Sequence, residues 1–114
     1  MKGLEIIKHE YEGYKTAHSF ESWRVAYLSH AERFQKENLH QLERHLLTDE
    51  IFMLLSGEGT LVIGEELKEI PMEKNIIYNV KQGVWHAIYV SEEALVFIVE
   101  NQDTGRDNTE YREM

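Results

Sequence analysis

Short runs of apolar, β-branched and aromatic residues recur along this chain, and turn-forming residues separate them. A spacing of roughly 8–12 residues between such runs is typical of strands in an all-β sandwich or barrel. The chain has 114 residues, a length that suits one domain with a single core. We therefore predict one all-β domain over residues 1–114 with its core at about 20–100 and strands near 23–29, 51–55, 60–63, 75–80, 84–90 and 94–99.

Three of the expected strands are apolar at consecutive positions, namely IFMLL, VWHAIYV and ALVFIV. A strand with one face in water alternates apolar and polar residues, so both faces of these strands must be covered. A monomer seldom tolerates a large exposed apolar patch, and a second copy of the chain is the simplest cover. We therefore expect a homodimer.

The charge balance narrows the range of partners. The net charge is −9, with 21 acidic residues against 12 basic ones. A protein that binds a phosphate backbone gains most of its affinity from clustered Lys and Arg, and the sequence has no such cluster. This composition argues against nucleic acid and against an anionic membrane surface as partners.

The chain has no cysteine, which removes disulfides, thiolate metal sites and cysteine nucleophiles. The N-terminus becomes charged after three apolar residues, which is too early for a signal peptide. No apolar stretch approaches the ~20 residues that a membrane span needs. We expect a cytoplasmic protein.

The segment from Ser29 to Leu47 is compatible with two structures that have opposite consequences. Capping-box spacing at its start and leucines near helical spacing favour one long helix. On that helix, Glu43 and His45 would point about 200° apart. On a strand they would share one face, because side chains alternate. No Gly or Pro stops the helix before Asp49, so we predict a loop or short helical turn over 30–37 and a strand over 39–46.

With this segment interpreted as a strand, a spaced set of polar residues emerges, Glu43-x-His45-x4-Glu50-x6-Gly57, followed by Gly83-x2-His86. This set resembles the two signature motifs of the cupin superfamily, in particular those of small bacterial cupins with an RmlC-like fold. The resemblance covers about residues 42–90. It implies a double-stranded β-helix, or jelly-roll barrel, that holds one metal ion in its interior.

The resemblance also implies the metal ligands. His45 matches the second histidine of the first motif, Glu50 matches its glutamate, and His86 matches the histidine of the second motif. Glu43 stands where the family has its first histidine. Two imidazoles and two carboxylates suit Fe, Mn, Ni, Co or Zn better than they suit Ca or Mg. The expected cofactor is one divalent transition metal held by Glu43, His45, Glu50 and His86.

Two functions from different classes follow. The first is a metal-dependent enzyme of isomerase, lyase or dioxygenase type that acts on a small polar molecule, such as a sugar or a carboxylate. In this enzyme Glu43 becomes a catalytic general base if it leaves the metal. The second function is a non-catalytic module that binds or senses a small ligand, which the substitution at Glu43 favours. Taken singly, the same residues also suit ordinary surface positions.

Gln41 and Tyr78 are the candidate substrate contacts, because both can face the barrel cavity. Tyr78 is equally compatible with a core position whose hydroxyl lies at the rim. Arg44 should point away from the barrel and pair with surface carboxylates. Residues 101–114 lack apolar periodicity and are expected to form an extended tail, either frayed or folded over its own barrel or that of a partner subunit. If it is ordered, Asn101, Asp103 and Arg106 would close one mouth.

Overall fold

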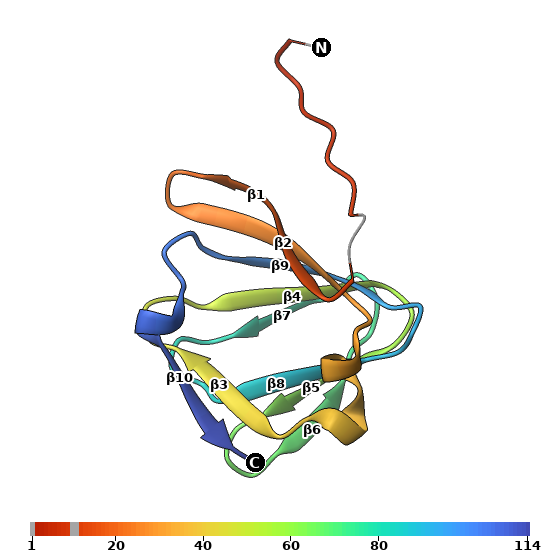
Figure 1. Cartoon of the computed structure of the whole chain (residues 1–114), viewed down its shortest axis with the longest axis vertical. Coiled ribbons are helices and arrows are strands. Elements are labelled where there is room, and N and C mark those ends of the chain that lie inside the picture. Colours follow the sequence, from red (N-terminus) through yellow and green to blue (C-terminus); the bar gives the residue numbers. More distant parts are fainter. Residues whose placement is uncertain (1, 10–11) are drawn as a thin grey trace.

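The computed structural model describes residues 2–9 and 12–114, and these form two five-stranded antiparallel sheets that face each other (Figure 1). The first sheet has the strand order β1-β2-β9-β4-β7, and the second has the order β10-β3-β8-β5-β6. This arrangement is the expected jelly roll. The two sheets are not closed into a barrel, because no strand pair among the described residues joins one sheet to the other.

The strands lie where the apolar runs predicted them, and three further strands were not predicted. The predicted strands are β2 (Trp23–Ser29), β3 (Gln41–His45), β4 (Glu50–Ser56), β5 (Gly59–Ile63), β7 (Ile77–Val80), β8 (His86–Val90) and β9 (Leu95–Asn101). The strands that the sequence analysis missed are β1 (Tyr14–Phe20), β6 (Lys68–Pro71) and β10 (Thr109–Glu113). All three lie at sheet edges, and β1 and β10 carry few apolar residues, so local periodicity gives little signal for them.

The conformation of the segment that contains β3 determines whether Glu43 and His45 point in the same direction. The segment forms two 3-10 turns, η1 (Glu32–Phe34) and η2 (Lys36–Asn38), and then enters β3. The long helix is therefore excluded, and the predicted turn followed by a strand is confirmed. Leu42 on one face of β3 is buried, while Glu43 and His45 lie on the same side of the strand.

The C-terminal segment is ordered against the second sheet. A short helical turn, η3 (Arg106–Asn108), leads into β10, which pairs antiparallel with β3 from Thr109 opposite His45 to Glu113 opposite Gln41. Of the two possibilities for the tail, the structure has it folded over its own chain. This pairing makes β3 an inner strand of its sheet.

The core lies between the sheets and consists of inward-facing residues from both. In β4 and β9 the buried positions alternate, with Phe52 and Leu54 in one strand and Val96 and Ile98 in the other. The intervening residues point to the outer face of the first sheet. There Val25, Val99 and Ile51 form one cross-strand row, and a second row consists of Tyr27, Phe97, Met53 and Ile77.

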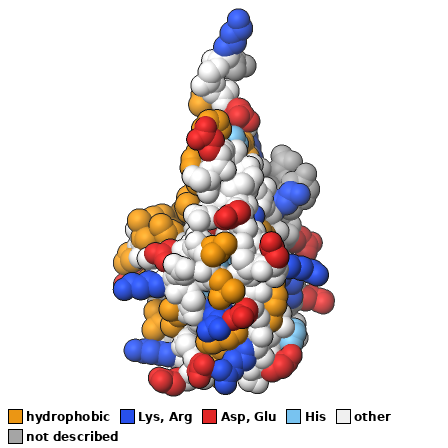
Figure 2. Space-filling model, turned by 90° about the vertical axis from the view of Figure 1, so that its left-hand side faces the viewer, with side chains coloured by type: hydrophobic (Ala, Val, Ile, Leu, Met, Phe, Trp, Pro, Cys, Tyr) orange, Lys and Arg blue, Asp and Glu red, His pale blue; other side chains and the backbone are white. Residues whose placement is uncertain are grey.

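Charged side chains of both signs are interspersed with small apolar patches on the face shown in Figure 2. The N-terminal segment projects from the body of the molecule in both views, and it exposes Leu4, Ile6 and Ile7 at 56%, 76% and 40%. Among the described residues, none of the helical segments is long and apolar enough to cross a membrane.

The turn between β4 and β5 explains the glycine at the end of the first motif. Gly57 has a φ of +71°, a backbone conformation that L side chains rarely adopt. A Cβ atom at this position would lie 2.6 Å from the Cα atom of Ala94, which is backbone and cannot rotate away. The turn therefore requires glycine for two independent reasons.

We predict that Gly57→Ala lowers the free energy of unfolding by more than about 2 kcal/mol, because backbone strain of roughly 1–2 kcal/mol adds to the steric clash. Gly64→Ala is the matched control, since Gly64 has a φ of +79° but no heavy atom within 4 Å of the added Cβ. In this control the free energy of unfolding should fall only by the contribution of backbone strain. Urea denaturation of both variants measures the difference, and equal losses would contradict the role of the Ala94 contact.

Candidate metal centre

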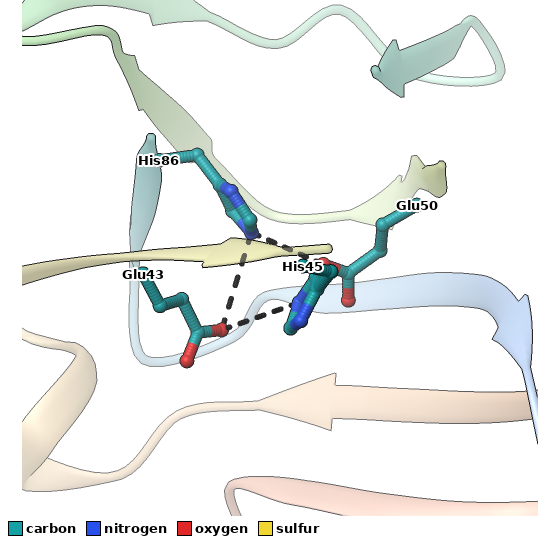
Figure 3. Close-up of side chains that lie close together, drawn as sticks. All are labelled: Glu43, His45, Glu50 and His86. Carbon is teal, nitrogen blue, oxygen red and sulfur yellow. Dashed lines mark hydrogen bonds and ion pairs between the residues drawn. The ribbon is translucent and has the colours of Figure 1, made fainter. Parts of the chain in front are cut away.

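Four side chains from three strands converge between the sheets (Figure 3). Glu43 and His45 come from β3, His86 comes from β8, and Glu50 comes from β4 on the opposite sheet. Each residue offers one ligand atom, and these atoms all lie within 4.8 Å of one another. The structure therefore brings together the full set of ligands that the sequence suggested.

The carboxylate of Glu50 is the centre of the cluster. Its Oε1 atom lies 2.9 Å from Nε2 of His45 and 3.1 Å from Nε2 of His86. All three residues are buried, with 5%, 8% and 2% of their surfaces exposed. Glu50 therefore links the two sheets through polar contacts between buried side chains.

Glu43 is the outer member of the cluster. Its Oε1 atom lies 3.7 Å from Nε2 of His45 and 4.0 Å from Nε2 of His86, so it makes an ion pair with each but no hydrogen bond. Its side chain is 41% exposed, whereas the other three are buried. Glu43 is thus the member with the most freedom to move.

The second nitrogen of each imidazole is held from outside the cluster. Nδ1 of His86 lies 3.0 Å from the carbonyl oxygen of Val84, and Nδ1 of His45 lies 3.0 Å from Oγ1 of Thr109. A carbonyl oxygen only accepts, so Nδ1 of His86 carries a hydrogen and Nε2 faces the Glu50 carboxylate. Nε2 must then hold a second proton, or else its lone pair points at a carboxylate oxygen and requires a cation between them.

The pKa shifts within the cluster lead to the same conclusion, that the Glu50 carboxylate requires a compensating positive charge. Burial lowers the pKa of His86, but the hydrogen bond to Glu50 and its charge outweigh burial and raise the pKa above the usual range. The pKa of His45 rises for the same reasons. Burial raises the pKa of Glu50, and the two imidazole hydrogen bonds outweigh it and lower the pKa. The Glu50 carboxylate is therefore ionised, and its buried negative charge must be compensated by a proton on an imidazole or by a metal cation.

These residues fit a divalent transition metal. Ligands that share one ion at about 2.1 Å lie roughly 3–4 Å apart, and the four contacts span 2.9–4.0 Å. Nitrogen and carboxylate oxygen are the donors preferred by Fe, Mn, Ni, Co and Zn. Both histidines have their Nδ1 atoms held by other groups, as metal-bound histidines usually do.

The cluster opens onto two cavities. The larger, of about 410 Å³, lies between the sheets, and Glu43, His45 and Glu50 line it. The smaller, of about 210 Å³, is lined by Glu43 and His86 together with Gln41. Pockets for small ligands usually measure roughly 300–1,000 Å³, so the larger cavity suits a small molecule. Glu43 borders both spaces.

The other predicted side chains divide into two groups. Gln41 lies beside the cluster, as expected from its place two residues before Glu43. Tyr78 lies in a different pocket, where its hydroxyl accepts a hydrogen bond from the backbone N–H of Glu73. Arg44 points away from the site, stacks on Trp85 at 4.4 Å and pairs with Glu110, which confirms the expected orientation.

A bonded group of polar residues in the larger cavity, Glu100 with Tyr14 and Arg24, was missed from the sequence. Glu100 is buried, and its Oε1 atom accepts hydrogen bonds from the hydroxyl of Tyr14 at 2.6 Å and from Nη2 of Arg24 at 2.8 Å. Burial and the charge of Glu50 raise the pKa of Glu100, and burial likewise raises that of Tyr14. Strand parity was the available signal, because Glu100 follows the buried positions of Val96 and Ile98 at period two.

Comparison with known proteins places this site in a recognised fold. No family model and no curated protein matches the sequence. Among solved structures, Streptomyces Pac13, described as a nucleoside dehydratase, matches with a TM-score of 0.69 and 11% identity, over 95% of this chain and 86% of that one. An RmlC-like cupin with a double-stranded β-helix fold from Methanocaldococcus jannaschii matches with a TM-score of 0.64 and 12% identity, over 89% and 92%.

A third match is the iron(II) form of HppE, with a TM-score of 0.56 and 17% identity, over 77% of this chain and 48% of that one. At these identities the comparisons concern the fold. The chain has the fold of the cupin superfamily, as its motifs suggested.

We predict that Mn²⁺, Fe²⁺, Ni²⁺, Co²⁺ or Zn²⁺ raises the thermal unfolding midpoint of metal-free protein. An ion that binds only the folded state stabilises it by about 2.7 kcal/mol at 100 times its dissociation constant. The shift should vanish in a His45→Ala, His86→Ala double variant whose fold is verified by circular dichroism. His40→Ala is the matched control, because His40 is exposed and outside the cluster.

A graded variant tests the outer support of the site in the same experiment. Thr109→Val removes the hydroxyl beside Nδ1 of His45, and loss of such a partner typically weakens metal binding about 10–100-fold. Thr104→Val serves as its control, since Thr104 lines the larger cavity without a bond to any ligand residue. If none of the five metals raises the thermal unfolding midpoint of the wild type, the metal centre is ruled out.

Proposed function

We propose that this protein is a small metal-dependent cupin enzyme of isomerase or lyase type that acts on a small polar molecule, such as a sugar or a carboxylate. The observation that carries the proposal is the convergence of two imidazole Nε2 atoms and two carboxylates beside a cavity of about 410 Å³, which Glu43, His45 and Glu50 line. The similarity in fold to Pac13, a nucleoside dehydratase, supports a lyase reaction. The similarity to iron(II) HppE supports a metal-bound site.

The ligand residues divide into a fixed group and a reactive one. His45, Glu50 and His86 are buried and bonded to one another, so they hold the site in place. A bound divalent ion would supply Lewis acidity to polarise a substrate oxygen. Apolar side chains of Leu28, Phe52, Ile88 and Ile98 line the same cavity and limit the access of water.

Glu43 is the proposed general base. Its half-exposed carboxylate lies at the border of both cavities and makes no hydrogen bond within the cluster. A carboxylate in this position can accept a proton from a substrate carbon next to a polarised oxygen function, and this transfer is the first step of many isomerase and lyase reactions. Glu43, which stands where the motif has its first histidine, therefore provides the site with a proton acceptor.

We predict that the metal-loaded protein catalyses exchange of carbon-bound hydrogen with solvent in D₂O. Proton NMR would follow the signals of small hydroxy- and ketocarboxylates, aldoses and uridine, the molecule with which Pac13 was crystallised. Glu43→Gln should reduce exchange about 10²–10⁴-fold while metal still raises the unfolding midpoint. If hydrogen exchange with solvent persists in this variant, Glu43 is not the general base.

The same screen separates catalysis from ligand binding. Saturable binding of one of these compounds, without exchange or product in the wild type, would contradict the enzyme and favour the non-catalytic binding module. Glu65→Gln is the control, because it removes an exposed carboxylate that lies outside both cavities.

We further propose that two copies pack through the outer face of the first sheet. This face carries the two apolar rows from Val25 to Ile51 and from Tyr27 to Ile77, and Ile77 is 59% exposed. The projecting N-terminal segment carries three further exposed apolar residues, and the ring of His9 at its base lies 5.4 Å from that of Tyr27 on this face. An apolar face of this kind favours association.

Sedimentation velocity is expected to give the mass of two chains for the wild type. Phe97→Glu places a charge in the middle of the apolar row and should yield monomers. Leu67→Glu is the control, since Leu67 is 39% exposed in a turn of the other sheet. A monomeric wild type at micromolar concentration would contradict the dimer.

A further inference from the structure

The arginines of this chain fall into two groups. Arg24, Arg44 and Arg112 each pair with a glutamate, at 2.8, 2.5 and 2.7 Å. Arg33 and Arg106 take part in no ion pair within residues 2–9 and 12–114. Acidic residues outnumber basic ones by 21 to 12, so acidic partners are not scarce. Among the arginines, the lack of a carboxylate partner within the described residues is confined to these two positions, and both residues are exposed.

Both unpaired arginines line the larger cavity, beside Glu43, His45 and Glu50. They reach it from distant parts of the sequence, Arg33 from η1 and Arg106 from η3. The fold thus directs the two guanidinium groups without carboxylate partners to one space, and this space already contains the candidate metal ligands.

Arg33 is oriented by an aromatic ring. Its guanidinium carbon lies 4.2 Å from the centroid of Phe34, which lines the same cavity. A guanidinium stacked on a ring keeps the N–H groups at its edge available as donors. Such an edge suits the paired oxygens of a carboxylate or a phosphate.

Arg106 lies on a braced turn. The side chain of Asn108 accepts a hydrogen bond from the N–H of Gly105 at 2.9 Å and donates one to the carbonyl of Asp103 at 2.8 Å. The N–H of Leu46, just after β3, donates to the carbonyl of Asn108 at 2.9 Å. The turn is therefore tied to the strand that carries Glu43 and His45, which fixes the backbone of Arg106 relative to the cluster.

The charges of the cavity indicate what it accepts. Glu100 neutralises Arg24, and a divalent ion would be neutralised by Glu43 and Glu50 with neutral imidazoles. The charges of Arg33 and Arg106 then have no counterpart in the cavity. The chain as a whole has a net charge of −9, so it offers an anion no long-range attraction, and selection must come from direct contacts.

We propose that Arg33 and Arg106 form an anion-binding subsite, which selects small substrates that carry a carboxylate or phosphate group. The anionic group binds the two guanidinium groups, and hydroxyl or carbonyl oxygens at the other end of the molecule face Glu43 and the metal ligands. This inference rests on the proposed function and narrows its substrate class to anions.

Binding of three compounds with the same three-carbon scaffold tests the subsite: glycerol, glycerate and glycerol 3-phosphate. Isothermal titration of Mn²⁺-loaded protein should show that at least one anion binds at least about tenfold more tightly than glycerol, because charge-assisted hydrogen bonds are stronger than neutral ones. The preferred anion identifies the group as carboxylate or phosphate. Ribose and ribose 5-phosphate form a second pair for a longer substrate.

The Arg33→Gln, Arg106→Gln double variant should lose the preference for anions, and each single variant should lose part of it. Arg112→Gln is the matched control, because it removes the same charge from an exposed ion pair outside the cavity. The Mn²⁺-induced thermal shift, measured on every variant, verifies that the fold and the metal centre are intact.

A preference that survives in the double variant overturns the subsite, and so does the absence of any preference in both series of compounds. Failure of wild-type protein to bind Mn²⁺ or the other metals contradicts the proposed function instead. The titrations are then repeated without metal, where loss of anion preference on Arg33 and Arg106 substitution still supports the subsite and its persistence overturns it.

Discussion

The contact of the Glu50 carboxylate with two imidazoles from the opposite sheet sets the conditions for the whole interior. An ionised carboxylate that is 5% exposed is costly unless positive charge or hydrogen-bond donors compensate it. His45 and His86 provide that compensation only if they carry extra protons or share a cation with Glu50. The centre of this fold is therefore a polar junction that proton or metal binding must complete.

The surroundings of this junction divide it into rigid and adjustable parts. Val84 and Thr109 hold the outer nitrogens of the two histidines, and β10 supplies Thr109 from the far end of the chain. Glu43 has no such support and remains partly exposed. A metal centre with three fixed ligands and one freer carboxylate can keep its ion while that carboxylate takes part in proton transfer.

The larger cavity places a second set of charges beside the metal centre. Glu100 is satisfied by Tyr14 and Arg24, so this triad forms a neutral and well-bonded wall. Arg33 and Arg106 have no comparable carboxylate partner. The contrast between a paired and an unpaired set of arginines in one cavity supports the proposed anion subsite, because the two exposed guanidinium groups keep their N–H donors available to a ligand.

The sequence by itself determined the strands rich in apolar residues and the set Glu43, His45, Glu50 and His86. Strand formation depends on local alternation and turn chemistry, and period-two spacing places Glu43 and His45 on one face wherever the strand lies. It also determined the outward direction of Arg44. Only the tertiary structure decided that β1 and β10 complete the sheets, because edge pairing depends on partners far along the chain rather than on local pattern.

The rest of the site was decided in the same way. Tyr78 shares the polar character of a site residue, yet strand pairing directs it into another pocket. Arg33 and Arg106 lie in short helical turns without periodicity, so no local pattern indicated Arg33, and Arg106 was expected only as one of the tail residues that close a mouth. The packing of η1 and η3 around one cavity gives them a common role. Local spacing therefore fixed the candidate metal ligands, and long-range packing fixed the positions of the arginines proposed to select the substrate.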